Sequence, residues 1–138
     1  MASRVTRAIA KTKTSKTKTD TPKGGARNTS TQVVRIWSAR ATPAGAKKYV
    51  SHFRRTVLPQ LQRLRGYRGA LLLRRREHQE IEIQVLTFWN SPAAIRQFAG
   101  ADVARAVVED EARAVLKNFD LRVAHFALVL DTQNPRQV

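Results

Sequence analysis

The segment 80–89 (EIEIQVLTFW) alternates between polar and apolar side chains over its first six residues. Side chains of a strand point to opposite faces in turn, so this pattern predicts a β-strand with one buried face. The preceding run 67–76 (YRGALLLRRR) also indicates a strand, and only the three polar residues 77–79 separate the two. Strands joined by so short a turn form an antiparallel hairpin, and any fold of this chain has to contain it.

A strand and a long helix are predicted before the hairpin. The segment Gln32–Arg40 (QVVRIWSAR) is rich in β-branched and aromatic residues, which favours a strand. Thr42 followed by Pro43 is typical of a helix start, with Thr42 as the N-cap. A kink is expected near Arg55–Leu58, because Pro59 lies inside the helical pattern. The apolar positions that define one helical face are Tyr49, Phe53, Val57, Leu61 and Leu64.

Further helices and one more strand are predicted after the hairpin. Ser91 and Pro92 indicate a second helix start, followed by a short helix over 93–98. Asp102 predicts the cap of another helix, which is expected to resume after the acidic residues 109–111 and to continue through 117. The last strand is expected over 119–130 (FDLRVAHFALVL).

These elements follow in the order β-α-β-β-α-β. The order is typical of the ferredoxin-like α+β fold, a four-stranded antiparallel sheet with helices on one face. The last strand carries apolar residues on both of its faces, for example Val123 on one and Phe126 on the other. A sheet face in water should be polar. We therefore expect a homodimer in which the second sheet face of one subunit packs against that of its partner.

The positive charge is concentrated near the N-terminus. The chain of 138 residues has 26 Lys and Arg against 10 Asp and Glu, a formal charge of +16. Residues 1–31 hold eight of the basic residues and one of the acidic ones, and include the run KTKTSKTKT. This composition predicts a disordered basic tail. Its expected role is to keep the chain soluble. The alternatives are weak, non-specific binding of nucleic acid or another polyanion, and an organelle presequence.

Composition also limits the class of protein. The folded domain is expected at 32–131, followed by a short polar tail at 132–138. No apolar run reaches the roughly 18 residues that a bilayer span requires, so no membrane segment is expected. The start lacks the apolar core of a signal peptide, which favours the cytoplasm. With no cysteine, disulfides, a thiol nucleophile and a cysteine zinc site are excluded.

Three stretches together resemble the antibiotic biosynthesis monooxygenase (ABM) family. They are VVRIWSARATPAGAKKY at 33–49, FRRTVLPQLQRLRGYRGALLLRR at 53–75 and EIEIQVLTFWNSPAAIRQFAG at 80–100. The resemblance covers about Gln32–Leu130. It implies the dimeric α+β barrel fold, with a pocket between the helices and the sheet of each subunit.

The resemblance also implies cofactor-independent oxygenation. Characterised members of the family oxidise electron-rich phenols and anthrones with O2, without flavin, haem or metal, because the substrate supplies the electron. The enzyme removes a proton and holds the resulting anion in a dry pocket. Some relatives bind haem and others lack catalysis. A non-catalytic module that binds a small ligand, and a polyanion-binding protein, are therefore the alternative functions.

Two histidines are candidates for the base. His125 shares its strand parity with apolar residues, so it lines a cavity or is a satisfied histidine of the core or interface. His52 lies beside the apolar helical face and either reaches the pocket or stays in solvent. The expected substrate-binding wall consists of Trp37, Phe53, Trp89, Asn90 and Phe98. For Trp89 and Asn90 the alternative roles are a core anchor and a turn residue.

Other polar groups are expected outside the site. His78 falls in the hairpin turn, and the acidic run 109–111 is expected to be a solvated turn. The arginines 74–76 either protect a sheet edge or steer an anionic substrate. No spacing of ligands indicates a metal site, and no cofactor is expected. Haem held by an axial histidine stays open as an alternative.

Overall fold

The computed structural model describes residues 31–133. Residues 1–30 and 134–138 are outside the described part, and with them nearly all of the predicted basic tail and most of the predicted C-terminal tail. The elements in chain order are β1 (Val33–Ala41), α3 (Pro43–His52), the π-helix η1 (Phe53–Val57), α4 (Leu58–Gln62), β2 (Tyr67–Glu77), β3 (Glu80–Trp89), α5 (Pro92–Ala99), α6 (Asp110–Val115), β4 (Asn118–Phe119) and β5 (Ala124–Ala127).

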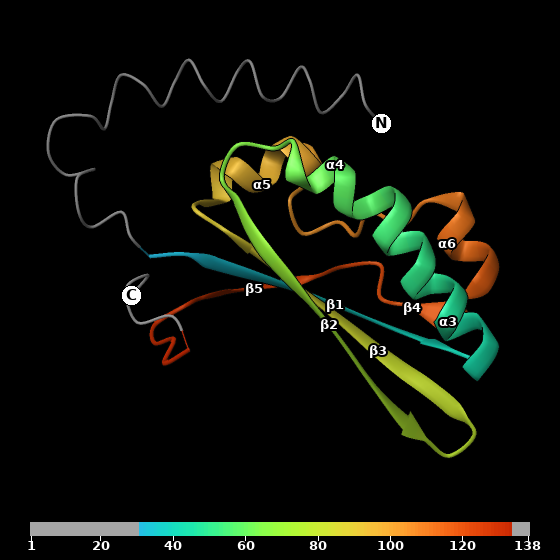
Figure 1. The fold of residues 1–138 in the computed structure, drawn as a ribbon. Helices are drawn as coiled ribbons and strands as arrows, with labels where there is room; N and C mark the ends of the chain where they lie inside the picture. The colour runs from blue at the N-terminus through green and yellow to red at the C-terminus, as the bar shows by residue number, and fades with distance from the viewer. Residues whose placement is uncertain (1–30, 134–138) are drawn as a thin grey trace, which may run out of the picture.

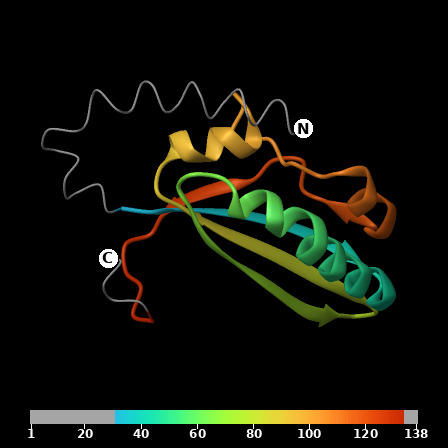
Figure 2. The ribbon, with the colours of Figure 1, turned by 45° about the horizontal axis from the view of Figure 1, so that its top comes forward.

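The strands form one antiparallel sheet in the order β2-β3-β1, and the two short strands β4 and β5 both pair with β1. Helices α3, α4, α5 and α6 lie on one side of this sheet (Figures 1 and 2). The ferredoxin-like α+β arrangement predicted from the order of the elements is confirmed. The hairpin of β2 and β3 is also confirmed, and its turn contains the exposed His78.

The helix after β1 begins as predicted and changes its winding before Pro59. The Oγ1 atom of Thr42 accepts a hydrogen bond from the backbone N–H of Gly45 at 2.9 Å, which is an N-cap contact. Residues Phe53–Val57 then form a π-helical turn. Pro59 has no N–H to donate to the preceding turn, and the wider winding accommodates this break. The kink predicted near Arg55–Leu58 takes the form of this π-helical turn.

Gly66 makes a close approach between the hairpin and α5 possible. Its φ of +93° lies in the left-handed region that favours glycine, and a Cβ there would lie 2.6 Å from the Cβ of Ala94. The predicted start of α5 is confirmed, because the Oγ of Ser91 accepts a hydrogen bond from the N–H of Ala94 at 3.2 Å.

The helix predicted after Asp102 is wrong. Residues 100–109 form an irregular segment, which we name the 100–109 loop, and α6 begins only at Asp110. The carboxylate of Asp102 binds the guanidinium of Arg122 at 2.9 and 3.2 Å instead of capping a helix. The loop backbone pairs with residues 121–123, through bonds from Ala106 N to Leu121 O and from Val123 N to Ala104 O. These backbone groups are thus satisfied by a neighbouring segment rather than within a helix.

The same pairing interrupts the last strand, so the single strand predicted over 119–130 is also wrong. Strand β4 ends at Phe119 and β5 begins at Ala124, because residues 121–123 leave the sheet to bond the 100–109 loop. After β5 the chain is irregular, and Val129 and Leu130 are exposed.

The core lies between the sheet and the helices. Its largest fully buried side chains are Trp89, Leu61, Ile83 and Ile95. The opposite sheet face has no helix over it in Figure 1 and carries exposed apolar side chains, which include Leu71 and Phe126. No helix of the described part is long and apolar enough to cross a membrane. The cellular compartment stays a prediction.

Candidate active site

A cavity of about 50 Å³ lies between the helix α3–η1, the sheet and the 100–109 loop. Most of its wall is apolar, and the loop contributes Val107 and Val108. Its aromatic side chains are Trp37, Tyr49, Phe53 and Phe98. Its polar side chains are Arg35, His52, Thr87 and Glu109. The cavity therefore combines ring surfaces with a small set of titratable groups, as small-molecule sites do.

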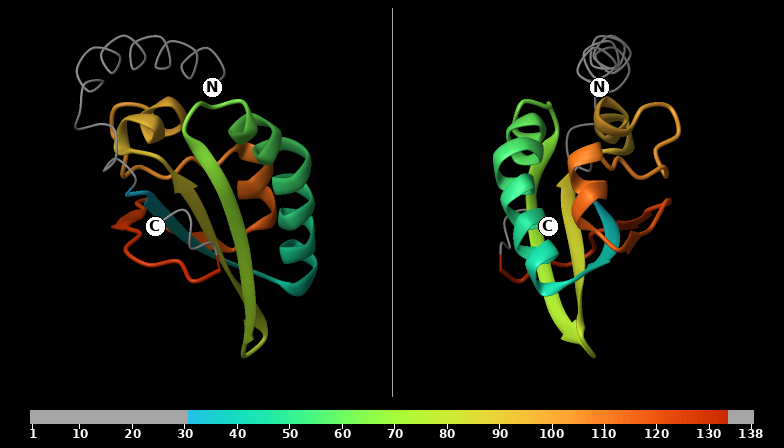
Figure 3. Two further views of the ribbon diagram at one scale, coloured as in Figure 1. Left: turned by 60° about the vertical axis from the view of Figure 1, so that its left-hand side comes forward. Right: turned by 90° about the vertical axis from the view of Figure 1, so that its right-hand side faces the viewer.

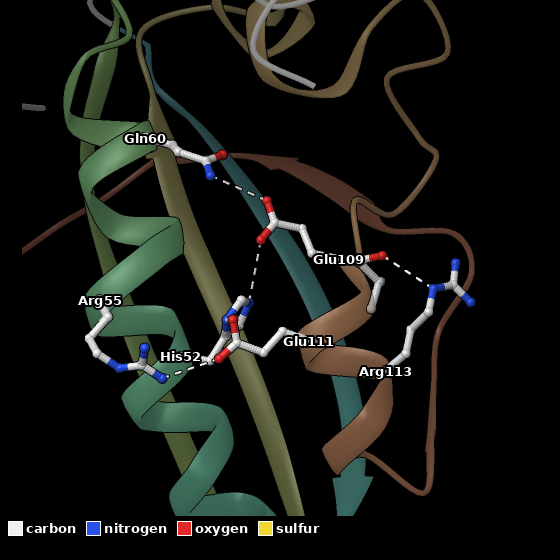
Figure 4. A network of polar contacts seen from close by, with 7 residues as sticks. His52, Arg55, Gln60, Glu109, Glu111 and Arg113 are labelled. Atoms are coloured by element: carbon white, nitrogen blue, oxygen red, sulfur yellow. Dashed lines mark hydrogen bonds and ion pairs between the residues drawn. The ribbon is translucent and has the colours of Figure 1, made fainter.

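His52 is the last residue of α3, and its side chain lies in the wall of this cavity at 2% exposure. The expectation that it stays in solvent is wrong, because α6 lies beside α3 (Figure 3). Its Nδ1 lies 3.1 Å from Oε1 of Glu111, and its Nε2 lies 3.6 Å from Oε1 of Glu109 (Figure 4). Neither contact is a well-aligned hydrogen bond. The ring is therefore buried within ion-pair distance of two carboxylates.

Groups on the first helix hold these two carboxylates. The amide of Gln60 donates a hydrogen bond to Oε2 of Glu109 at 3.3 Å, and a guanidinium nitrogen of Arg55 lies 3.2 Å from Oε2 of Glu111 (Figure 4). The hydrogen bond from Arg55, and to a lesser extent His52, lowers the pKa of Glu111. The solvated turn predicted for the acidic run 109–111 is wrong for Glu109. Asp110 and Glu111 are exposed, as predicted, but they form the first turn of α6 rather than a loop turn.

Tyr49 supplies a hydroxyl to the same wall. Its ring centroid lies 6.1 Å from that of His52 and 5.7 Å from that of Trp37. Burial, and to a lesser extent the charge of Glu109, raises the pKa of Tyr49, so the hydroxyl is protonated at neutral pH. A protonated hydroxyl in an apolar wall can donate a hydrogen bond to an oxygen that becomes negative during a reaction.

His125 is not part of the cavity wall. It lies on β5, half-buried, with its Nε2 3.1 Å from a guanidinium nitrogen of Arg35. Burial, and then the charge of Arg35, lower the pKa of His125, which favours a neutral ring that accepts a hydrogen bond at Nε2. His125 therefore contacts the cavity only through Arg35.

The residues predicted for the substrate-binding wall divide into two groups. Trp37, Phe53 and Phe98 line the cavity. Trp89 does not. It is fully buried, with its ring in contact with those of Phe98 and Tyr67. Asn90 lies in an exposed bend after β3. For Trp89 and Asn90, the structure matches the alternative roles of core anchor and turn residue.

Arg35, Tyr49 and Glu109 are polar residues of the cavity that the sequence analysis did not assign to the site. For two of them, the sequence pattern could have indicated a place in the site. Arg35 shares its strand parity with Trp37, and Tyr49 lies four residues before Phe53 on one helical face. Glu109 had no such pattern, because its position depends on how α6 packs against α3.

Other charged groups lie apart from the cavity wall. The arginines 74–76 are exposed on β2, the outermost strand of the sheet, as expected for a protected edge. Within residues 31–133, no group of three or more histidine or acidic side chains is arranged to hold a metal ion.

Comparison with known proteins gives matches only to solved structures. No protein-family profile and no curated protein matches the chain. A protein from Bacillus cereus assigned as an antibiotic biosynthesis monooxygenase superposes with a TM-score of 0.50 at 13% identity, over 73% of this chain and 96% of that one. A monooxygenase from the gene ActVA-Orf6 of Streptomyces coelicolor, in complex with nanaomycin D, gives a TM-score of 0.51 at 16% identity, over 74% and 89%.

The chain has the fold of the ABM monooxygenases. A third structure, a mutant of the cofactor-independent oxygenase SnoaB from Streptomyces nogalater, has a TM-score of 0.46 at 19% identity, over 72% of this chain and 92% of that one. The first two superpositions establish the fold of this chain. At identities this low, its activity has to be argued from its own residues.

Proposed function

We propose that this protein is a cofactor-independent monooxygenase that oxidises an electron-rich aromatic molecule with O2. The observation that carries the proposal is His52, a buried imidazole between two carboxylates in the wall of an aromatic cavity. The ABM-type fold supports the reaction class, and the complex of one structural neighbour with nanaomycin D supports a polyketide-type aromatic ligand.

In the proposed reaction, His52 takes the proton of a phenolic hydroxyl of the substrate. The carboxylates of Glu109 and Glu111 stabilise the imidazolium that forms. The phenolate gives an electron to O2, and the superoxide combines with a ring carbon that carries hydrogen. The peroxide that forms takes the proton back from His52. Loss of water then leaves a quinone carbonyl. One atom of O2 enters the product and the other leaves in the water.

Two further features of the cavity suit this reaction. Tyr49 is a protonated donor for the phenolate oxygen, in a site where few polar groups compete for it. The rings of Trp37 and Phe53 offer apolar surface to an aromatic substrate. A low-dielectric wall strengthens the electrostatic contacts of the anion.

The test is O2 uptake by the purified full chain, without added cofactor, over a panel of hydroquinones, phenols and anthrones. We expect protein-dependent uptake and, for the phenols and anthrones, one oxygen atom from ¹⁸O2 in the quinone. His52→Gln should lower kcat by about 10²- to 10⁴-fold. His78→Asn, at the exposed hairpin turn, is the matched control and should leave the rate unchanged.

The same experiment separates the alternatives. Loss of turnover in His125→Gln but not in His52→Gln would move the base to His125. Absence of uptake over the whole panel would contradict the monooxygenase proposal and favour a ligand-binding module. A haem titration monitored by absorption would then test the remaining alternative.

We infer further that two copies pair through the sheet face that carries no helix. The cross-strand register aligns Leu71, Leu86, Ile36 and Ala124 in one row on this face. The neighbouring row contains Phe88, Val34 and Phe126. Leu71 and Phe126 are 50% and 56% exposed in the single chain, and a continuous apolar patch of this kind favours burial against a partner.

A further inference from the structure

Arg35 places a buried positive charge in the wall of the cavity. It is 4% exposed and lies on β1, two residues before Trp37 on the same face. No carboxylate of residues 31–133 forms an ion pair with it. Burial lowers the pKa of Arg35 to about 10, so it keeps its charge at neutral pH. A buried cation without a counterion is unfavourable, and it gains most from an anionic partner.

The present partners of Arg35 are all neutral. Its guanidinium donates to the carbonyl oxygens of Val103 at 2.5 Å and Arg105 at 2.9 Å, and contacts Nε2 of His125 at 3.1 Å. The Phe98 ring centroid lies 5.7 Å from its central carbon. These contacts satisfy donors but leave the charge uncompensated. An ionised oxygen would form stronger hydrogen bonds with the guanidinium than a neutral carbonyl does.

Two of these partners belong to the 100–109 loop, which also limits the size of the cavity. At about 50 Å³ the cavity has room for a few water molecules. Sites for drug-sized ligands occupy several hundred Å³. A wider polar groove of about 800 Å³ lies on the other side of the same wall and shares Val107, Val108 and Glu109 with the cavity. A ligand of two or three rings therefore needs this loop to move, and Arg35 holds the loop.

We propose that Arg35 is the specificity-determining residue of the site and binds an anionic oxygen of the aromatic substrate. The anion replaces the loop carbonyls of Val103 and Arg105 as the acceptor for the guanidinium. The loop is thereby released, and the charge of Arg35 is neutralised. The inference rests on the proposed function, because it names the substrate class of the same cavity. The anionic oxygen is either a carboxylate on the ring or the phenolate that His52 produces.

The test uses non-oxidisable ligands, so that it does not depend on turnover. Isothermal titration of the full chain with 2-naphthoate and with 2-naphthamide compares the same ring with and without a charge. We expect the dissociation constant of 2-naphthoate to be at least tenfold lower. Equal affinities would exclude a carboxylate as the bound anion, and no binding of either ligand would overturn the proposal.

The source of the anion is resolved with 2-naphthol. If the site stabilises a phenolate, bound 2-naphthol should show the absorption spectrum of naphtholate at neutral pH in the wild type and not in Arg35→Gln. A neutral spectrum together with tight binding of 2-naphthoate assigns the site to a carboxylate. A neutral spectrum without a preference for 2-naphthoate again overturns the proposal.

Variants link the preference to Arg35. Arg35→Gln should abolish the preference for 2-naphthoate, and Arg35→Lys should restore part of it. Arg96→Gln removes an equal charge from the exposed surface of α5, and should keep the full preference. A preference that survives in a folded Arg35→Gln variant would overturn the proposal. If Arg35→Gln does not fold, the proposal is tested by comparing Arg35→Lys with the wild type. A full preference for 2-naphthoate in Arg35→Lys would then contradict the role of the guanidinium.

The outcome is separable from the monooxygenase proposal. A preference for 2-naphthoate without O2 uptake on any phenol would keep the anion site and reject the oxygenase. O2 uptake with neither a preference for 2-naphthoate nor a naphtholate spectrum would keep the oxygenase and reject the anion site.

Discussion

The Oε1 atom of Glu109 lies 3.6 Å from Nε2 of His52, so the residue that precedes α6 faces the last residue of α3. The imidazole is almost fully buried and the carboxylate is about one-quarter exposed. A carboxylate at this place stabilises the positive charge that the ring gains when it accepts a proton. In the proposed reaction, the packing of α6 on α3 places this carboxylate beside the base His52.

Glu109→Gln tests this relationship at constant side-chain size. The amide cannot stabilise the imidazolium, so we expect kcat to fall by about 10- to 100-fold with little change in KM. Asp110→Asn makes the same chemical change at an exposed neighbouring position and should leave kcat unchanged. O2 uptake under saturating substrate measures both. An unaltered kcat in Glu109→Gln would show that the carboxylate does not assist His52.

Gly45 sets the distance between α3 and α6. A Cβ at this position would overlap the backbone carbonyl oxygen of Val115, at the end of α6. Although alanine is the better helix former, Gly45→Ala should lower the free energy of unfolding by about 1–3 kcal/mol, because a backbone atom cannot rotate away. It should also reduce kcat by moving Glu109 away from His52. Urea unfolding gives the first quantity and O2 uptake the second.

The control for Gly45→Ala is Lys48→Ala, an exposed change on the same helix. Its effect on the free energy of unfolding should stay within about 0.5 kcal/mol. A Gly45→Ala variant more stable than the wild type would contradict the close packing of the two helices.

His125 makes stability depend on pH near neutrality. Burial, and then the charge of Arg35, lower its pKa below the ordinary value of 6.5. Below about pH 6.5 the unfolded chain therefore binds a proton at this residue before the folded chain does, so acidification lowers the free energy of unfolding. The lowered pKa values of Asp102 and Glu111 act only at more acidic pH.

The measurement is the urea midpoint of unfolding at pH 7.5, 6.5 and 5.5. The decrease between pH 7.5 and 5.5 should be smaller in His125→Gln than in the wild type, since glutamine does not titrate. Contributions of the groups that both proteins share cancel in the comparison. Equal decreases would show that His125 has the same proton affinity in both states.

The sequence predicted correctly those elements whose formation depends on neighbouring residues in the chain. The alternation in 80–89, the caps Thr42 and Ser91 and the break before Pro59 each have a local cause, and each is present in the structure. The predictions were wrong where a residue distant in the sequence determines the local structure. Asp102 is a good N-cap by type, but Arg122 binds its carboxylate.

The residues of the candidate site also divide into those that the sequence could place and those that it could not. Trp37, Phe53 and His52 could be placed from strand parity and helical spacing, because each lies on or beside a periodic apolar face. The partners of His52 could not be predicted. Glu109 and Glu111 lie in a segment whose path is fixed by backbone bonds between the 100–109 loop and residues 121–123. The acidic run 109–111 resembles a solvated turn until that path is known.

The last prediction concerns the sheet face that carries no helix. Phe126 is 56% exposed in the single chain and lies in a row with Val34 and Phe88. Phe126→Lys should convert a dimer into a monomer, because a buried interface cannot accept an unpaired charge there. The fold should persist, since Phe126 is not part of the core between sheet and helices.

Light scattering after gel filtration measures the change. The wild type should have twice the 15.5 kDa mass of the chain at micromolar concentration, and Phe126→Lys should have the single-chain mass. Gln62→Lys adds the same charge on exposed α4 and should stay dimeric. A monomeric wild type would contradict the pairing. A Phe126→Lys variant that stays dimeric would place the interface elsewhere on the molecule. If O2 uptake falls in the monomeric variant while His52 and Glu109 are intact, the cavity itself depends on the partner subunit.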